Sequence, residues 1–265
     1  MICNIAMDID ALPFSSRYFF PGFEQGDLFV RSTDSLIFAL DSCLVMTAAG
    51  YIPFDYLYSL IPGIADLHYD SATLCWVFNF IRCAEYSAIE NLHFHQLKCI
   101  ASAANTFGFH SLQILCRLAL RCFKNQYPKE ILMLAVECGY HSLLPTLAGT
   151  DLIDVPLASL EDILKDPSIY RAWSLFRDHR IAALDCVKGH HATVHAGPNC
   201  VTWASEAATT YLKLERPSMM DPSRIRQAFE PRGNLPACCL SALECWRKDA
   251  EEIVQNLPTF SVILF

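Results

Sequence analysis

Three histidines and a cysteine occur near residue 195 in a spacing that could bind a metal ion. The order is His190-His191, then His195, then Cys200. Three imidazoles and one thiolate can hold Zn²⁺ in a tetrahedron. The spacing is not that of a recognised zinc finger, and the neighbouring glycines and Pro198 indicate a loop. A polar, solvated loop is therefore the favoured interpretation, and a zinc-binding protein organised by loop 190–200 is the alternative.

A second group of thiols, Cys238, Cys239 and Cys245, lies at the start of a predicted amphipathic helix that contains Trp246. The group lacks a Cys-x-x-Cys pair, so a packing role is favoured over a metal or redox role. A cysteine hydrolase would need a cysteine, a histidine and a carboxylate brought together in space. No nucleophile-elbow sequence supports such a set. We therefore assign no catalytic, cofactor-binding or metal-ligating residue, and expect neither enzymatic activity nor a cofactor.

The composition restricts the classes of partner. The chain of 265 residues carries a net charge of −8 and has no stripe rich in lysine and arginine. Nucleic acids and anionic membranes both attract cationic surfaces, so neither is expected as a partner. Apolar residues make up 53% of the sequence and charged residues only 18%. This balance predicts large cores, or apolar surface that another protein covers.

The cysteines and the first residues indicate an intracellular location, in the cytoplasm or nucleus. The thirteen cysteines are an odd number, and most lie within apolar helical patterns. Reduced cysteines of this kind behave as small hydrophobic residues. Residues 1–11 contain Asp8 and Asp10 and lack the basic start of a signal peptide. No apolar run reaches the ~18–20 residues of a membrane-spanning helix.

The elements that position these residues are a small sheet followed by many helices. Two apolar runs, 28–31 and 36–40, flank a polar turn and predict a β-hairpin. Helices are predicted from 43 to 49, from 71, around 97–108 and from 111, whereas 51–69 is predicted to be irregular. Further helices are expected at 128–138, 142–148, 160–164, 170–188, 201–214, from 222 and at 240–253. There is no βαβ alternation, so the fold class is α+β rather than a nucleotide-binding α/β fold.

The order of several weak motifs in residues 26–123 resembles the BTB/POZ fold. Segment 26–32, GDLFVRS, is similar to its G-D-[VIL]-x-[VIL] first strand. Segments 36–40 and 42–49 match its second strand and first helix. Segment 70–81, DSATLCWVFNFI, resembles its D-S-x-T-L segment, and 103–108, AANTFG, resembles its A-A-x-[KR]-[YF] helix end.

The second half narrows the resemblance to BTB proteins typical of basidiomycete fungi. Segment 127–132, YPKEIL, followed by Ala135, Gly139-Tyr140 and Leu143-Leu144, is similar to their H-P-x-E-[VI]-L…A…Y-x-x-L segment. Tyr170 to Trp173, with Arg177 and Arg180, resembles their W-x-x-[YF]-[RY] segment. The resemblance covers residues 26–190. It implies a lead-in at 1–25, a BTB/POZ-like domain at 26–124 and an all-α extension at 125–265.

This resemblance implies protein–protein interaction, often homodimerisation through the first strand and helix. In some members it implies docking to cullin-3 as a ubiquitin-ligase substrate adaptor, but no clear cullin-contact signature is present here. The chain departs from the pattern at Asp41, where the family often has histidine, and at Arg82, where it usually has tyrosine. Two facing Asp41 carboxylates would be costly in a symmetric interface. Phe29, Leu36 and Phe38 form either a half-buried sheet or part of a dimer surface.

Overall fold

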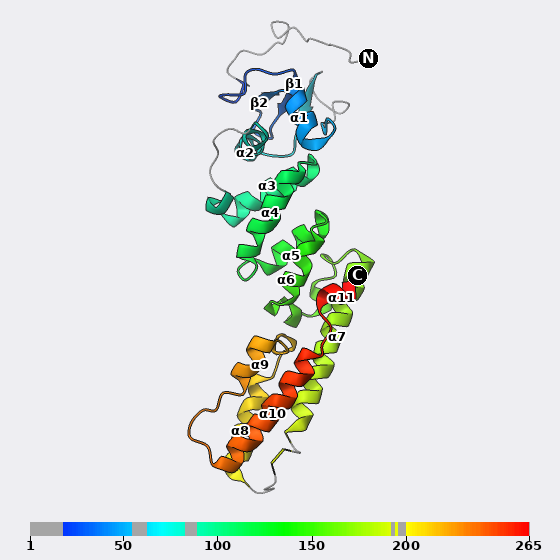
Figure 1. The fold of residues 1–265 in the computed structure, drawn as a ribbon. Helices are drawn as coiled ribbons and strands as arrows, with labels where there is room; N and C mark the ends of the chain where they lie inside the picture. The colour runs from blue at the N-terminus through cyan, green and yellow to red at the C-terminus, as the bar shows by residue number, and fades with distance from the viewer. Residues whose placement is uncertain (1–17, 55–62, 83–88, 192–193, 196–199, 265) are drawn as a thin grey trace. The chain divides into compact units, whose positions relative to one another are not determined.

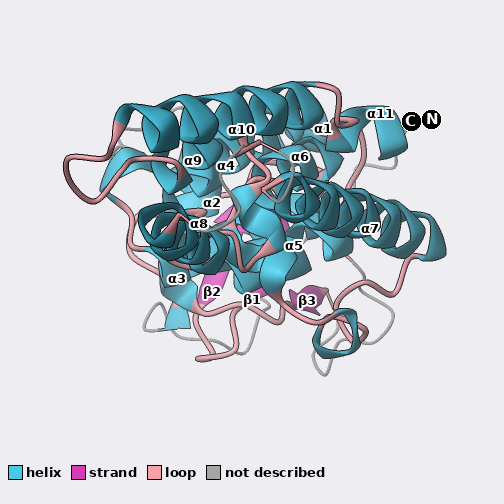
Figure 2. Ribbon diagram, turned by 90° about the horizontal axis from the view of Figure 1, so that it is seen from below, coloured by secondary structure: helices cyan, strands magenta, loops and turns pink. Residues whose placement is uncertain are grey.

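The structure is a computed structural model that describes residues 18–54, 63–82, 89–191, 194–195 and 200–264. The chain divides into two compact units, Met1–Phe123 and Lys124–Phe265, which Figure 1 draws in blue to green and in green to red. Each unit is described by itself. Figure 2 shows that helices dominate and that strands are few. A mostly helical chain with a small sheet agrees with the predicted α+β class.

The first unit contains a three-stranded sheet. Strands β1 (Leu28–Arg31) and β2 (Ile37–Leu40) are antiparallel, with Val30 opposite Phe38, and confirm the predicted hairpin. A third strand, β3 (Ile64–Asp66), pairs in parallel with β1, so the order is β2-β1-β3. The prediction that residues 51–69 are irregular is therefore wrong at β3. Residues 55–62 lie outside the described residues.

Among the described residues of this unit, four α-helices and two short 3₁₀ turns accompany the sheet. The helices are α1 (Ser42–Ala49), α2 (Ser71–Ile81), α3 (Phe94–Thr106) and α4 (His110–Leu120). The 3₁₀ turns are η3 (Ile89–Asn91) and η4 (Arg121–Phe123). Helix α3 packs on α2 and α4. All four helices were expected from periodicity and caps, although α3 begins three residues earlier than the predicted stripe.

Aspartates join the hairpin to the helices that follow. Asp27, which opens β1, accepts hydrogen bonds from the backbone N–H and hydroxyl of Ser42 at the start of α1, at 2.7 and 2.5 Å. Asp34, in the hairpin turn, accepts the same two bonds from Ser71 at the start of α2, at 2.8 and 2.5 Å. Asp70 then caps α2 by accepting from Thr73. These contacts fix where each helix leaves the sheet.

An aromatic core holds the first unit together. Phe38 of β2 is fully buried and lies against Phe20, Phe23 and Phe78, with ring centroids 4.8 to 5.5 Å apart. Phe29 on β1 is also buried, and Leu36 is half-buried. The hairpin is therefore covered within the unit, and β2 is buried at all four positions, which is more than the half-buried sheet that was expected. Phe29 and Phe38 offer no exposed face for the alternative, a dimer surface.

Among its described residues, the second unit contains α-helices, 3₁₀ turns and loops but no strand. Its α-helices are α5 (Pro128–Glu137), α6 (Leu144–Ala148), α7 (Pro167–His190), α8 (Val201–Lys213), α9 (Pro222–Ala228), α10 (Ala237–Gln255) and α11 (Phe260–Leu264). Its 3₁₀ turns are η5 (His141–Leu143), η6 (Asp151–Asp154), η7 (Leu157–Ser159) and η8 (Pro217–Met219). The helix predicted at 160–164 is wrong, because η7 ends at Ser159 and residues 160–163 form only turns.

Helices α7, α8, α9 and α10 surround an apolar core of this unit. Trp246 of α10 is fully buried, and its indole N–H donates to the Val187 carbonyl at 2.7 Å. That carbonyl lies in the last turn of α7, where helix carbonyls lack an intrahelical partner. Trp246 therefore fills the core and satisfies a helix end at once. Phe260 of α11 packs edge-on against Trp173 and Phe176 of α7.

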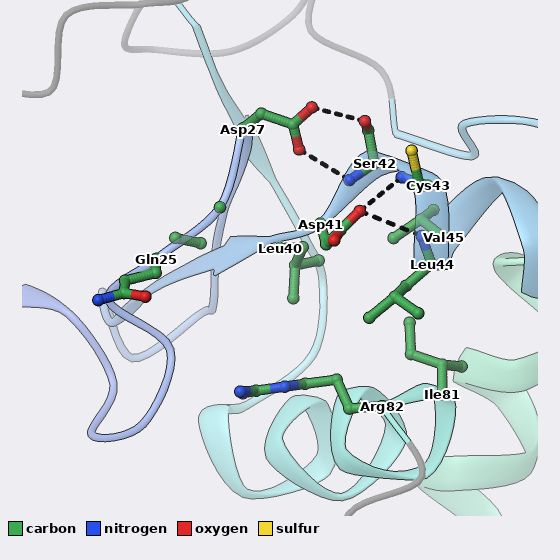
Figure 3. A pocket seen from close by; sticks show the side chains of 12 residues that line it. Gln25, Asp27, Leu40, Asp41, Ser42, Cys43, Leu44, Val45, Ile81 and Arg82 are labelled. Carbon is green, nitrogen blue, oxygen red and sulfur yellow. Dashed lines mark hydrogen bonds between the residues drawn. The ribbon is translucent and has the colours of Figure 1, made fainter.

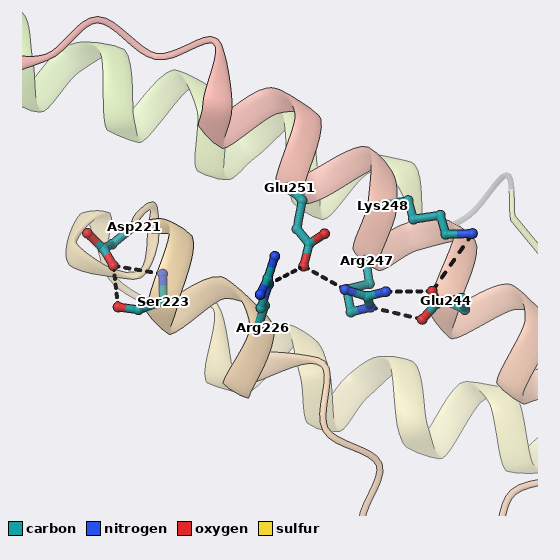
Figure 4. Close-up of polar contacts among 7 residues, drawn as sticks. All are labelled: Asp221, Ser223, Arg226, Glu244, Arg247, Lys248 and Glu251. Atoms are coloured by element: carbon teal, nitrogen blue, oxygen red, sulfur yellow. Dashed lines mark hydrogen bonds and ion pairs between the residues drawn. The ribbon is translucent and has the colours of Figure 1, made fainter.

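Ion pairs fasten α9 to α10 on the outside of this core. Glu251 of α10 accepts from Arg226 of α9 at 2.9 Å and from Arg247 of its own helix at 2.6 Å (Figure 4). Asp221 caps α9 by accepting from Ser223, as the Asp-Pro start predicts.

Among the described residues, no helix is both long enough and apolar enough to cross a membrane.

Candidate functional site

Helix α1 presents an apolar outer face in the first unit. Its eight residues, SCLVMTAA, carry no charge, and only Val45 and Ala49 are buried. Leu44 is 38% exposed and Met46 44% exposed. Exposed apolar side chains on a surface without charge often mark a contact with another protein. Leu44 and Met46 are two residues apart and therefore lie on opposite flanks of the exposed side of α1. This exposed side, between Leu44 and Met46, is a candidate protein-contact surface.

A groove beside this face extends the apolar surface. It has a volume of about 510 Å³ and lies between α1, the end of α2 and the start of α4. Its lining contains no charged side chain: Leu44, Thr47, Ala48, Phe80, Ile81, Phe109, Ser111 and Leu112. Protein contact sites combine such apolar hollows with polar rims. The groove adjoins the exposed side of α1 at Leu44, whereas Met46 lies on the opposite flank of the helix and outside the groove.

A polar hollow of about 520 Å³ lies at the N-terminal end of α1 (Figure 3). Asp27 and Asp41 both contribute to it, as does Arg82. Burial by itself would raise the pKa of Asp27, but the hydrogen bonds from Ser42 outweigh it and lower that pKa. Each charged group of the hollow thus already makes hydrogen bonds within the unit.

The two departures from the BTB pattern have structural roles in this hollow. Asp41 is exposed and caps α1, since its carboxylate accepts from the N–H groups of Cys43 and Leu44. Arg82 ends α2, donates to the Gly22 carbonyl at 2.7 Å and lies 4.6 Å from the centre of the Phe23 ring. Both residues therefore stabilise the unit itself.

A second candidate site lies in the helical unit, where the structure regroups the residues of the alternative, a zinc site in loop 190–200. His190 belongs to the last turn of α7, where its Nδ1 lies 3.6 Å from an Asp249 oxygen. His191 bonds to the Lys188 carbonyl and lies against Trp246. Neither residue is in the group that could hold a metal. The set of three histidines and Cys200 is therefore wrong in its membership.

His195 and Cys200 instead meet Cys238 and Cys239, which the sequence interpretation treated separately as packing groups. The imidazole nitrogen and three sulfurs lie within 4.8 Å of one another. The Sγ of Cys239 is 3.5 Å from that of Cys200, 3.9 Å from that of Cys238 and 3.8 Å from His195 Nε2. The chain thus brings together four metal-ligating atoms, and we refer to these four residues as the thiol–imidazole cluster.

Helix starts and an aromatic ring position this cluster. Cys200 is the N-cap of α8, and its sulfur accepts from the Trp203 N–H at 3.4 Å. Cys238 and Cys239 lie in the first turn of α10. The Trp203 ring stacks on the His195 imidazole, with centroids 5.2 Å apart and planes 16° apart. Both segments therefore hold their side chains in defined positions.

The electrostatics differ among the thiols. The hydrogen bond from the Trp203 N–H lowers the pKa of Cys200, whereas burial raises the pKa of Cys239. Cys200 is the thiol whose anion the fold supports, because helix N-termini stabilise thiolates. Cys238 is exposed. Cys245, the remaining residue of the predicted thiol group, is exposed further along α10 and lies outside the cluster.

A Cys-His-Asp arrangement also occurs on the surface of this unit, but its geometry does not suit a hydrolase. Cys186 Sγ lies 3.8 Å from His190 Nε2, and His190 Nδ1 lies 3.6 Å from Asp249. The latter distance is too long for the hydrogen bond that orients a catalytic imidazole. Both Cys186 and His190 lie near the C-terminal end of α7, where the helix dipole disfavours a thiolate. This arrangement gives no support for catalysis.

The second unit also has an apolar hollow of about 550 Å³ on α8. Its lining includes Trp203, Tyr211 and Leu212, and the last two are 43% and 63% exposed.

Comparison with known protein families, with curated proteins and with solved structures finds no match to the chain. Functional interpretation therefore depends on the chain's own residues.

Proposed function

We propose that the chain is a protein-interaction module without enzymatic activity, whose first unit is a BTB/POZ-type homodimerisation unit. The second unit then presents its α8 hollow to a further protein. One observation carries the proposal: α1 has no charged residue and leaves Leu44 and Met46 in solvent, with an uncharged groove on the Leu44 flank. Removing such a surface from water favours association by roughly 25 cal/mol per Å² of apolar area.

The sequence resemblance points to the same helix. It implies dimerisation through the first strand and the first helix, and α1 is that helix. The outer edge of β2 is already occupied, because Phe20 donates to the Ile37 carbonyl and Ala39 donates to the Phe23 carbonyl, at 2.8 and 2.9 Å. The helix face is thus the better candidate for self-association than the strand edge.

Asp41 does not oppose this dimer. The cost of two facing carboxylates applies only if both are buried without partners. In this unit Asp41 is exposed, and two N–H groups at the start of α1 already donate to it. A symmetric contact centred on Met46, five residues along the chain from Asp41, leaves the carboxylates at the rim, where water screens their repulsion.

The experiment is sedimentation velocity of the purified chain over the micromolar range. We expect a dimer for the wild type and a monomer for Met46→Glu, since each dimer would bury two carboxylates against apolar surface. Leu118→Glu is the matched control. Leu118 is 52% exposed on α4 and does not line the groove, so this variant remains a dimer. A wild-type monomer throughout the range would refute self-association.

The same preparations test the cullin-3 role that the resemblance implies for some members. Purified cullin-3 is mixed with the chain and the mixture is separated by size-exclusion chromatography. Co-elution would identify a ubiquitin-ligase adaptor. Separate elution, with the dimer retained, would leave a scaffold that does not recruit this ligase.

A further inference from the structure

The thiol–imidazole cluster of the second unit is independent of the α1 surface and has the composition of a metal site. It contains one imidazole and three thiols from two segments about 40 residues apart along the chain. We propose that His195, Cys200, Cys238 and Cys239 bind one zinc ion in a closed, structural site.

The distances in the cluster fit a tetrahedron of the size that zinc requires. Zinc lies about 2.3 Å from sulfur and 2.0–2.1 Å from nitrogen, which places two sulfurs about 3.8 Å apart and sulfur and nitrogen about 3.6 Å apart. The Cys239 sulfur lies 3.5 and 3.9 Å from the other two sulfurs and 3.8 Å from the imidazole nitrogen, and all four atoms lie within 4.8 Å of one another. An ion at the centre would therefore need only small side-chain adjustments.

The surrounding backbone suits the charge of a zinc–thiolate centre. Three thiolates and one neutral imidazole exceed the charge of Zn²⁺ by one negative unit. The first turns of α8 and α10 both meet at the cluster, and their N–H groups have no intrahelical partner. The Trp203 N–H already donates to Cys200. These groups stabilise the excess negative charge without a cationic side chain.

The site is structural because the protein supplies all four ligands. A catalytic zinc keeps one position open for water or substrate, and a closed set leaves none. The ion joins the segment between α7 and α8 to the start of α10. Trp203, which stacks on His195, belongs to the core that α7, α8, α9 and α10 share. Zinc binding is thus coupled to the packing of this four-helix core.

The first test is elemental analysis of the full chain, purified under reducing conditions without chelator and then incubated with zinc and desalted. We expect about one zinc per chain. Less than about a tenth of an equivalent would overturn the proposal, because structural zinc sites retain the ion at neutral pH. If the zinc content also stays below a tenth of an equivalent in excess reductant, oxidation of the thiols does not explain the missing zinc.

The second test identifies the ligands through cobalt, which binds the same sites as zinc. The wild-type chain with Co²⁺ should show sulfur-to-cobalt charge transfer and the strong visible bands of tetrahedral coordination. Cys200→Ser should lose zinc and weaken these bands, and Cys245→Ser, on the same α10 helix, should keep both. Because Cys200→Ser could fail to fold, His195→Cys is included. It keeps four ligands and should increase the charge-transfer intensity.

Thiol reactivity provides a readout that does not need a variant. Cys238 is exposed, so a free thiol there alkylates readily, whereas a zinc-bound thiolate is protected. We expect alkylation of Cys200 and Cys238 only after a chelator is added, and equal alkylation of Cys245 before and after. Alkylation without chelator, or a mass two hydrogens lower from a Cys200–Cys239 disulfide, would overturn the zinc site.

Discussion

Gly26 lies two residues before β1, and its replacement even by alanine should be damaging. A Cβ at this position would overlap the backbone O, C and N atoms of Leu40. These are backbone atoms, so neither strand can relieve the overlap by rotating a side chain. In Gly26→Ala the start of β1 must move away from β2, although the two strands pair along their whole length.

The expected cost follows from the hydrogen bonds next to Gly26. The Asp27 N–H donates to the Leu40 carbonyl at 3.0 Å, and Asp27 accepts two bonds from Ser42. A net hydrogen bond contributes about 0.5–1.5 kcal/mol, and the two exposed Ser42 bonds lie at the lower end. Loss of all three destabilises the unit by about 1–3 kcal/mol. With a slope of about 1–3 kcal/mol per molar urea, the midpoint should fall by roughly 1 M.

Gly189→Ala is the matched control, and it should raise the urea midpoint rather than lower it. Gly189 lies in the last turn of α7, and an added Cβ meets nothing within 4 Å. Alanine in a helix is more stable than glycine by roughly 0.5–1 kcal/mol. Urea unfolding followed by hydrogen exchange reports each unit separately. An unchanged midpoint for β1 and β2 amides in Gly26→Ala would refute the reasoning from the backbone overlap.

Two further changes test the polar contacts of each unit. Trp246→Phe removes the donor to the Val187 carbonyl and should destabilise the second unit by about 1–3 kcal/mol, because a buried acceptor loses its partner. Tyrosine fluorescence or circular dichroism during urea unfolding measures this loss of stability. A loss near zero would mean that water replaces the indole as the donor. Hydrogen bonds from Ser71 lower the pKa of Asp34, so its contribution to stability is present above the unfolded pKa of about 3.9 and is lost as pH falls through the lower folded pKa. Asp34→Asn should therefore lower the midpoint at pH 7 and make little difference in strong acid, and an equal loss at both pH values would exclude the ionised carboxylate as the cause.

The helix starts and ends were predictable because their causes are local. Asp70 before α2 and Asp221-Pro222 before α9 are N-terminal signals that need no tertiary information. Gly50 ends α1 in the left-handed conformation, at φ 81°, which glycine adopts at little cost. The hairpin was predictable for the same reason, since its two runs flank a short polar turn.

Strand β3 could not be found by the same method. It has three residues, Ile64–Asp66, and pairs in parallel with β1 across more than thirty positions of the chain. A run this short has no measurable alternation, and a parallel partner leaves no turn beside it. The ion pair of Arg31 with Asp66, at 2.6 Å, joins the two strands but carries no sequence pattern.

The thiol–imidazole cluster was missed because a local search pairs neighbours in sequence. His190 and His191 are close to Cys200 along the chain, but α7 continues through His190 and directs both rings elsewhere. The true neighbours of Cys200 come from the start of α10. One signal was available: Cys200 and Cys238-Cys239 each fall at a predicted helix start, where backbone N–H groups favour thiolates.

The cap of α8 strengthens the case that Cys200 has a function beyond packing. Four other helices of the chain, α1, α2, α7 and α9, begin with an aspartate whose oxygen accepts from the first turn. Helix α8 begins with a sulfur, which is absent from the residues that N-caps prefer and is a weak acceptor. Serine or aspartate at position 200 would cap α8 better, but neither would supply the soft ligand that a cluster of two further cysteines and a histidine provides for zinc. Metal binding explains both the weaker cap and its position, whereas packing explains neither, since Cys200 is only partly buried.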